Sequence, residues 1–366
     1  MRETPIVRNE RGVVLMIALF LIAALSLLGL AANRNITVDT SIASSQLSAI
    51  QSFYHAEAGL QLGQLEALQR LSTLDWTDFS PLLNNDTNVF MLSFNKVIPS
   101  GSGTYSVTVA NNSNEMDPQQ DKDRTIAIKS EGKCNGSTSV LVSTIRALTI
   151  PALPGGLTFV GGATMSVAGN QYCISGLDHT LNDQTGNPTG SSTPVAAIAL
   201  CAGAGLSVTG NLTQNNLSGS TTLTNSPSLS IALINSYIND LKPAATTTIN
   251  CSGLNLTYQK GNAIMNCPSG EGVMAVDGDL EFANGANWKG LIIVRGGRLK
   301  LSGNNEIRGG IIIANDPLNG QTVGVDLAAG GDINLLYSHE AVHTIGNQAV
   351  IHNAGKWKVL SWQRAR

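Results

Sequence analysis

The most apolar stretch of the chain lies near its N-terminus. From Val13 to Ala32 the sequence reads VVLMIALFLIAALSLLGLAA, twenty residues without a charged side chain. At 1.5 Å per residue, a helix of this length spans the ~30 Å hydrocarbon core of a bilayer. The apolar part of a secretory signal peptide is shorter, about 7–15 residues, and ends at a small-residue cleavage site. The pattern therefore predicts a transmembrane helix over residues 13–32.

A helical pattern continues beyond this stretch. No Pro or Gly interrupts residues 34–58, and apolar side chains recur there at three- and four-residue steps. We therefore expect one long helix that crosses the membrane and continues outward to about Leu71.

Three later segments alternate between apolar and polar residues, as strands with one buried face do. They cover residues 103–110, 125–130 and 140–145, which predicts a small antiparallel sheet behind the long helix. The Asn- and Asp-rich stretch between the first two strands reads as a solvated hairpin loop. Its carboxylates could instead offer oxygens to Ca²⁺, the candidates being Asp117, Asp121 and Asp123.

A change of composition marks a second region. Residues 151–156 read Pro-Ala-Leu-Pro-Gly-Gly and predict a linker, after which Gly, Asn, Thr and small apolar residues dominate. Within this region a short alternating phrase that ends in Gly-Asn occurs at residues 165–170, 206–211 and 299–304. Each phrase predicts a short strand that ends in a turn.

Apolar runs in the same region recur at a nearly constant interval. They begin at Val273, Leu291 and Ile311, eighteen and twenty residues apart, which is about one coil of a β-solenoid. In such a stack Ile292 and Ile312 would point into a narrow core. A β-sandwich with similar strand spacing is the alternative.

The last part of the sequence predicts a helix and then a strand. Apolar residues fall at helical intervals over Asp332–His343, with Asp332 as the N-cap, and residues 357–362 alternate as a strand. We expect both elements to cap the open end of the solenoid, whose last coil would otherwise expose its core.

Composition and charge restrict the possible partners. Only 13% of residues are charged, against about 25% in an ordinary soluble domain, and Gly reaches 38, which favours β-structure and turns. The net charge is −3 and no long basic run is present, so nucleic acid is not the default partner. The five cysteines form no CxxC pair, so neither a zinc knuckle nor a thioredoxin-type site is indicated.

Charges ahead of the apolar stretch predict the orientation in the membrane. Arg2, Arg8 and Arg11 outnumber Glu3 and Glu10, and positive charge favours the cytoplasmic side. The large C-terminal part would then be extracytoplasmic.

Three stretches carry a resemblance to a known family. The basic-Gly junction and apolar start at residues 11–19, the small-residue stretch 28–32 and the phrase Tyr-His-Ala-Glu-Ala-Gly-Leu at residues 54–60 together resemble the N-terminal region of PilX-type minor pilins. The resemblance covers about the first seventy residues. It implies a type IV pilus role, an inner-membrane location, and partners among other pilins and pilus assembly proteins.

The resemblance also assigns roles to single residues. It implies a cytoplasmic leader, residues 1–12, that a prepilin peptidase would remove between Gly12 and Val13. At the fifth position after Gly12, where major pilins usually carry Glu, this chain has Ile17, which suits a subunit at a filament end. Glu57 is either a solvated helix residue or one that packs or pairs with other pilins.

We therefore expect an α+β fold. Its parts are the leader, a transmembrane helix over residues 13–32, a pilin-like helix and antiparallel sheet over residues 33–150, and a mainly β, solenoid-like outer domain over residues 151–366.

The sharpest motif for chemistry is His339-Glu340-Ala341-Val342-His343. It matches HExxH, in which two His one helical turn apart bind Zn²⁺ and the Glu acts as a general base. The alternative function is thus a membrane-tethered zinc hydrolase that uses His339 and His343. A zincin also needs a third ligand, and the candidates His352, Asp326 and Glu306 have no recognised spacing.

Carboxylates in the second region suggest a weaker enzyme hypothesis. Asp277, Asp279, Glu281 and Asp326 could act as paired acids in a polysaccharide-cleaving enzyme, and alternation would send the first three to one face. No glycine-rich loop stands in a nucleotide-binding context, so nucleotide binding is excluded. We predict a structural, non-enzymatic minor pilin or pseudopilin without a cofactor, whose outer domain serves assembly, the pilus tip or adhesion.

Overall fold

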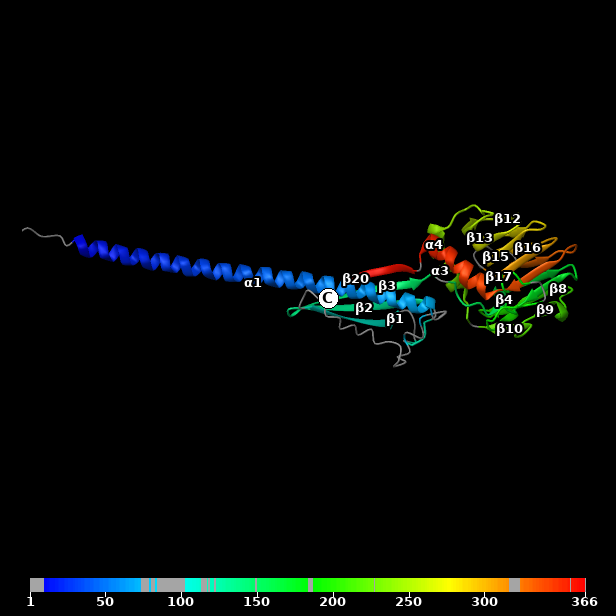
Figure 1. Cartoon of the computed structure of the whole chain (residues 1–366), viewed down its shortest axis with the longest axis horizontal. Helices are drawn as coiled ribbons and strands as arrows, with labels where there is room; N and C mark the ends of the chain where they lie inside the picture. Colours follow the sequence, from blue (N-terminus) through cyan, green and yellow to red (C-terminus); the bar gives the residue numbers. More distant parts are fainter. Residues whose placement is uncertain are drawn as a thin grey trace, which may run out of the picture.

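The computed structural model describes residues 10–73, 79, 83, 103–112, 117, 119–121, 123–148, 150–183, 187–226, 228–315, 323–355 and 357–365. Figure 1 shows a long rod, α1, with a small sheet along its second half and a larger β domain beyond its end. The C-terminus lies beside α1, so the chain returns from the outer domain to the helix.

The helix α1 runs over Glu10–Thr73, 64 residues, or about 96 Å at 1.5 Å per residue. The predicted single helix is confirmed. Its second half packs on the three predicted antiparallel strands, which are β1 (Gly103–Asn111), β2 (Thr125–Cys134) and β3 (Ser137–Ala147). The core between helix and sheet includes Ala56, Leu60, Ala67, Tyr105, Val107, Ile126, Ile128, Leu141 and Ile145.

The fourth strand of this sheet comes from the far end of the sequence. β20 (Trp357–Ala365) pairs antiparallel with β3, with a bulge between Val359 and Ser361. The sequence predicts this strand, but its predicted role as a cap of the outer domain is wrong, because its backbone bonds to β3. The outer domain is therefore inserted between the third and fourth strands of this four-stranded sheet.

Within the described residues, two further sheets build the outer domain. The first outer sheet has the order β10-β7-β4-β17-β15-β13-β11. In this sheet β19 also pairs with β17, β6 pairs with β19, and β9 pairs with β6. The second outer sheet has the order β12-β14-β16-β18-β5-β8. The strands of the first sheet are β4 (Gly155–Val160), β6 (Tyr172–Ser175), β7 (Ala196–Cys201), β9 (Leu217–Ser218), β10 (Leu223–Ser226), β11 (Leu254–Lys260), β13 (Gly270–Asp277), β15 (Asn287–Arg295), β17 (Asn305–Ala314) and β19 (Ile333–Tyr337). Those of the second sheet are β5 (Ala163–Val167), β8 (Leu206–Gly210), β12 (Ala263–Met265), β14 (Leu280–Phe282), β16 (Arg298–Leu301) and β18 (Gly324–Leu327).

The strand pairs of both outer sheets are parallel. The three apolar runs lie on β13, β15 and β17, which are neighbours, with Val273 opposite Leu291 and Ile292 opposite Ile311. The three Gly-Asn phrases coincide with β5, β8 and β16 of the second sheet. The sandwich alternative is wrong, because such sandwiches are built from antiparallel sheets.

The helix α3 (Ile231–Leu241) connects the two edges of the first outer sheet, because it lies in the sequence between the edge strands β10 and β11. β4, β7 and β10 advance from the middle of the first sheet to one edge. After α3 the chain begins again at the opposite edge with β11, and β13, β15 and β17 advance until β17 pairs with β4. The two runs of strands therefore form one continuous stack.

The first outer sheet is buried on both faces. One face packs against the second sheet, with Phe159, Phe282, Trp288 and Ile292 in the shared core. The other face packs beneath helices, and Ile312 lies there with Val273 and Ile293. The prediction that Ile312 points into the narrow core between strands is therefore wrong, whereas Ile292 does lie between the sheets.

The C-terminal helix begins later than predicted. Ile333–Tyr337 form the strand β19, so Asp332 is not an N-cap. Helical structure starts with the π-helix η3 (Glu340–Gly346) and continues as α4 (Asn347–Ala354). This helix buries Val342 and Val350 against the first sheet, so it covers a face of the stack and does not cap its end.

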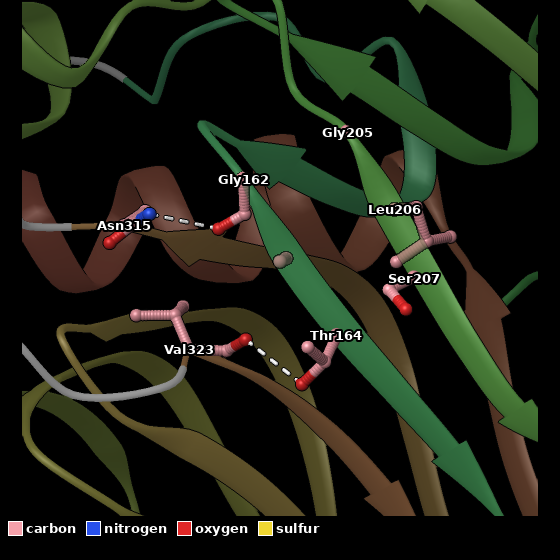
Figure 2. A pocket seen from close by; sticks show the side chains of 8 residues that line it. Gly162, Thr164, Gly205, Leu206, Ser207, Asn315 and Val323 are labelled. Carbon is pink, nitrogen blue, oxygen red and sulfur yellow. Dashed lines mark hydrogen bonds between the residues drawn. The ribbon is translucent and has the colours of Figure 1, made fainter.

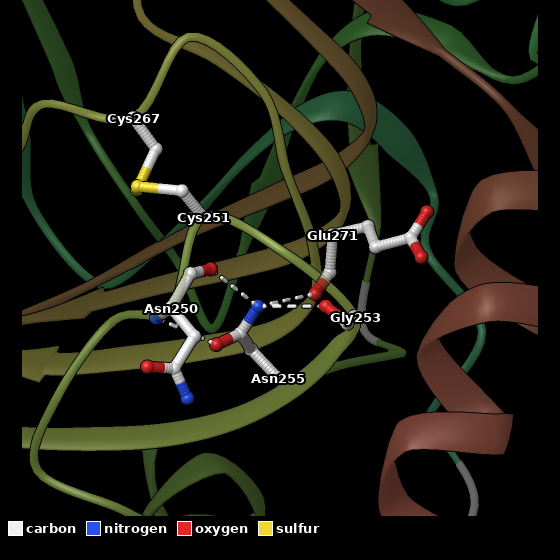
Figure 3. Close-up of a disulfide and its surroundings, with 6 residues drawn as sticks. All are labelled: Asn250, Cys251, Gly253, Asn255, Cys267 and Glu271. Carbon is white, nitrogen blue, oxygen red and sulfur yellow. Dashed lines mark hydrogen bonds between the residues drawn. A yellow bond between two sulfur atoms is a disulfide. The ribbon is translucent and has the colours of Figure 1, made fainter.

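A disulfide-bonded loop stands at the β11 end instead. Cys251 and Cys267 form a disulfide across sixteen residues, a pairing that the sequence alone did not predict. Figure 3 shows the buried Asn255 beside it, whose side chain donates to the carbonyls of Asn250 and Gly253 and accepts from the Asn250 amide. The short 3-10 helices η1 (Gln214–Asn216) and η2 (Lys242–Ala244) complete the described elements.

Candidate functional site

The first half of α1 has no cover from the described part of the chain over residues 13–47. Every residue from Val13 to Leu47 is exposed, and Ser48 is the first buried residue of the helix. By length and composition α1 could cross a membrane. In Figure 1 this half extends away from all three sheets as an isolated rod. Such an apolar surface requires a bilayer or other apolar helices around it.

The second half of α1 lies close to the four-stranded sheet β1-β2-β3-β20 because small residues line the contact. A β-carbon at Gly59 would lie 2.7 Å from the Tyr105 ring, a distance at which the ring would have to move. Ser52 hydrogen-bonds Ser139 on β3 at 2.8 Å in the buried interface. The Ala-Glu-Ala-Gly-Leu phrase therefore has a packing role, since its Ala56 and Gly59 are buried.

A third part of α1 is an apolar seam on the side away from the sheet. It consists of Ile36, Leu47, Ile50 and Tyr54, which are each more than half exposed. Their spacings of eleven, three and four residues place them on one side of a helix. This seam continues the exposed apolar surface of the first half of α1 toward its second half.

The residues predicted for processing and pairing all belong to α1. Val13 is exposed and Gly12 lies within the helix, while residues 1–9 of the leader fall outside the described residues. Glu57 is half-buried and, in the described chain, neither hydrogen-bonded nor ion-paired. The cleavage after Gly12 and the pairing role of Glu57 stay predictions.

The HExxH motif has helical geometry but no metal-ligand set in the described chain. The His339 and His343 rings stack with centroids 4.2 Å apart. Glu340, the would-be base, accepts a hydrogen bond from the Leu181 amide at 3.3 Å. Among the described residues no group of three His, Cys, Asp or Glu side chains could hold a metal ion. The candidates His352, Asp326 and Glu306 are thus not brought together with the His pair.

The four carboxylates of the weaker enzyme hypothesis are separated, and three of them are ion-paired. Asp277 bonds Arg295 on the helix-covered face of the first sheet, whereas Glu281 belongs to the second sheet, so the expected common face is wrong. Burial acts to raise the pKa of Asp277, but hydrogen bonds from Arg295 and Tyr258 hold it below its ordinary value. The remaining pairs are Asp279 with Lys300 and Asp326 with Arg298.

The calcium candidates accept hydrogen bonds from backbone and side-chain groups of their own loop and its neighbours. The Asp121 carboxylate accepts from the amides of Phe79 and Thr125, at 2.7 and 3.2 Å. Asp123 accepts from the Asn112 side chain at 2.8 Å, and Asp117 accepts from the Gln119 amide at 2.9 Å. These contacts describe a hydrogen-bonded loop between β1 and β2.

A chain of polar side chains that the sequence did not single out lies behind β6. His179 stands 3.1 Å from the Ser175 hydroxyl and 3.3 Å from the Asp183 carboxylate. All three side chains are almost fully buried, so this Ser-His-Asp order holds a loop and offers no accessible nucleophile. Burial acts to raise the pKa of Asp183, but bonds from Thr189, Thr180 and Arg308 hold it below its ordinary value. No motif spacing signals this cluster, because tertiary packing forms it.

The outer domain has a shallow cavity of about 560 Å³. Figure 2 shows it at the start of β5 and β8, with Thr164 and Ser207 at its wall and Asn315 bonded to the Gly162 carbonyl. No ionisable side chain stands among its described lining residues. The described lining of the cavity therefore offers hydroxyl, amide and backbone groups to a ligand.

Comparison with known proteins matches the N-terminal region. Residues 11–61 match the PilX N-terminal family, as the sequence resemblance predicted. No curated protein matches the chain. Among solved structures, the competence-associated pilin ComZ from Thermus thermophilus is similar at 14% identity, covering 87% of this chain and 98% of that chain, with a TM-score of 0.31. A TM-score this low does not establish a shared fold.

Proposed function

We propose that this chain is a membrane-anchored minor pilin or pseudopilin that acts in type IV pilus assembly or at the pilus tip. The observation that carries the proposal is the uncharged apolar stretch of α1 from Val13 to Ala32, which is exposed throughout and belongs to the segment that matches the PilX N-terminal family. Its partners are other pilins and pilus assembly proteins, which contact α1. The role is structural, without a catalytic residue or nucleotide.

We infer that the outer domain is a β-solenoid. The parallel pairing of strands one coil apart supports this inference, as does the interval of eighteen to twenty residues between the apolar runs. The second sheet is the part farthest from the anchor in Figure 1. It is therefore the face that an adhesive or tip-located subunit would present.

The proposed division of the chain follows the sequence with one addition. Residues 1–12 are the leader, 13–32 the membrane span, 33–150 the pilin-like helix and sheet, and the outer domain begins at residue 151. The pairing of β20 with β3 assigns residues 357–365 to the pilin-like sheet. The chain crosses the inner membrane once, and the Cys251–Cys267 disulfide suits an oxidising extracytoplasmic compartment.

Processing gives the direct test of this proposal. In pili sheared from the source cells, we expect mass spectrometry to find this chain with Val13 as its first residue, because the leader would be removed on assembly. Gly12→Leu should block removal and leave the chain in the membrane fraction. If the chain were absent from sheared pili, or present there with Met1 retained, the proposed processing and assembly would be wrong.

Display of the outer domain requires a firm joint with the pilin-like sheet, and Asp240 supplies one. Its buried carboxylate accepts from Arg146 of β3 at 3.0 Å and from Lys358 of β20 at 2.7 Å. Both cations belong to the four-stranded sheet β1-β2-β3-β20, and Asp240 belongs to α3 of the outer domain. One side chain therefore binds the outer domain to both strands between which it is inserted.

Loss of this carboxylate should loosen the joint. Asp240→Asn removes the negative charge between two cations, and we expect it to destabilise the joint by about 2 kcal/mol. The cost is limited because Lys358, which is 46% exposed, stays hydrated after it loses the buried carboxylate. The measurement is the rate of limited proteolysis at the two crossings near residues 149–154 and 355–356. Asp326→Asn, which breaks a pair in the second sheet, is the matched control. Equal cleavage rates in both variants would contradict a joint at Asp240.

A further inference from the structure

β20 presents an exposed aromatic side chain against α1. Trp362 is 52% exposed, and its ring meets the ring of Phe53 edge-on, with centroids 6.2 Å apart. Phe53 in turn lies edge-on to Tyr54 at 5.9 Å, and Tyr54 is 62% exposed. Phe53, Tyr54 and Trp362 form one surface feature, the aromatic patch, built from two elements about 300 residues apart in sequence.

The patch is continuous with the apolar seam of α1. Tyr54 is itself the last residue of the seam, which runs from Ile36 along the side of the helix away from the sheet. A helix that packs along the seam at the usual interaxial distance of about 8–10 Å would reach Tyr54, and Trp362 would then stand beside it. Large aromatic side chains that are half exposed in a free subunit are frequent anchors of protein interfaces.

Two charged groups flank the patch. The Arg364 guanidinium lies 6.0 Å from the centre of the Phe53 ring. Glu57 follows Phe53 by four residues, so it lies one helical turn farther along α1. Its half-buried carboxylate has no partner within the described chain. The patch is thus an apolar centre with one cation and one carboxylate at its border, which suits a protein partner.

The position of the patch excludes the bilayer core as its cover. About 32 Å of helix separates Phe53 from the end of the apolar span at Ala32, which is more than the thickness of the hydrocarbon core. A partner that covers the patch is therefore a protein element and not a lipid chain. A helix that packs along the seam would lie beside α1 from Ile36 to Tyr54 and would reach the patch at its outer end.

We propose that the aromatic patch receives the α1 helix of a neighbouring pilin, with Trp362 as its anchor. This rests on the proposed function and adds a contact to it: the C-terminal strand, which returns from the outer domain, takes part in subunit packing. Incorporation of the subunit is thereby linked to correct pairing of β20 with β3.

The test uses the full-length chain in cells that make pili. We expect Trp362→Ala to lower the amount of this chain in sheared pili at least about fivefold, with an unchanged amount in the membrane fraction. The matched control is Val359→Ala, because Val359 is 47% exposed on the same strand, and its level in pili should stay within about twofold of the unmodified chain. Undiminished incorporation of the Trp362→Ala chain would overturn the proposal.

A photo-crosslinking residue at position 362 identifies the occupant, and one at position 50 probes the seam separately. We expect both to crosslink to a peptide from the N-terminal helix of another pilin, identified by mass spectrometry. Crosslinks to pilins from position 50, with only lipid, self or non-pilin adducts from position 362, would overturn the patch but keep the proposed pilin function. The absence of pilin adducts at both positions would contradict the proposed contact of other pilins with α1, and with it the patch.

Discussion

Replacing Ile312 by Asp is expected to unfold the outer domain, whereas Ile312→Val should leave it folded. Ile312 is fully buried in the core between the first outer sheet and the helices that cover it, and it lies in register with Ile293 and Thr158 on the neighbouring strands. A carboxylate there would be ionised without solvent, or protonated without a hydrogen-bond partner. The cost should exceed about 4 kcal/mol, a large share of the roughly 5–15 kcal/mol that stabilises a domain.

The valine variant removes one methyl group and should cost about 1 kcal/mol. The measurement is thermal unfolding of the full-length chain in detergent, followed by near-ultraviolet circular dichroism. Ile264→Asp serves as the matched control, because Ile264 is 64% exposed on the edge strand β12, and it should change stability by less than about 0.5 kcal/mol. An Ile312→Asp chain that melts like the control would contradict the two-sided burial of the first sheet.

The apolar runs show how far the sequence can predict this fold. Residues 291–294 are apolar without alternation, and such runs are typical of strands buried on both faces. Their spacing predicts a repeat of about one solenoid coil, and β13, β15 and β17 pair in that order, in parallel. The helices that cover the other face of the first outer sheet could not be inferred in that role. Helices α3 and η3 lie far from these strands in the sequence, and only the fold brings them onto the sheet.

The C-terminal region shows why local patterns mislead. Ile333, Leu336 and Tyr337 fit helical spacing, yet Ile333, Leu335 and Tyr337 fit strand alternation equally well. The strand β19 pairs with residues 305–309 of β17, whereas β4 pairs with residues 311–314 of the same strand. The strand β20 was predicted from its alternation, but alternation carries no information about the partner. Only the tertiary structure shows that β20 returns to β3 and brings Trp362 to α1.

The candidate site was predictable where it depends on local sequence. Twenty uncharged residues make α1 long and apolar enough to cross a membrane, and small residues such as Ala56 and Gly59 line the close helix contact. The HExxH match shows the opposite case, since a five-residue pattern does not supply a third ligand. The buried Ser175-His179-Asp183 chain has no sequence signal, because Arg308 of β17 and the loop after β6 meet only in the fold.

A column of glycines crosses the first outer sheet. Gly272, Gly290 and Gly309 lie opposite one another on β13, β15 and β17, each with φ between +120° and +140°. A β-carbon on Gly290 would overlap the carbonyl oxygen of Gly272 on the preceding coil. The column therefore lets successive coils approach along a path that side chains would block.

Gly290→Ala should destabilise the outer domain by more than about 3 kcal/mol, because it combines an unfavourable φ with a clash against backbone that cannot move away independently of its coil. The matched variant is Gly285→Ala, since Gly285 has φ +80° but open space around its α-carbon, so only the conformational cost of about 1–2 kcal/mol applies. Chemical unfolding of both full-length variants in detergent separates the two contributions. If Gly290→Ala were no less stable than Gly285→Ala, the coils could not approach as closely as the pairing of Gly272 with Gly290 requires, and the stacked arrangement of β13, β15 and β17 would have to be revised.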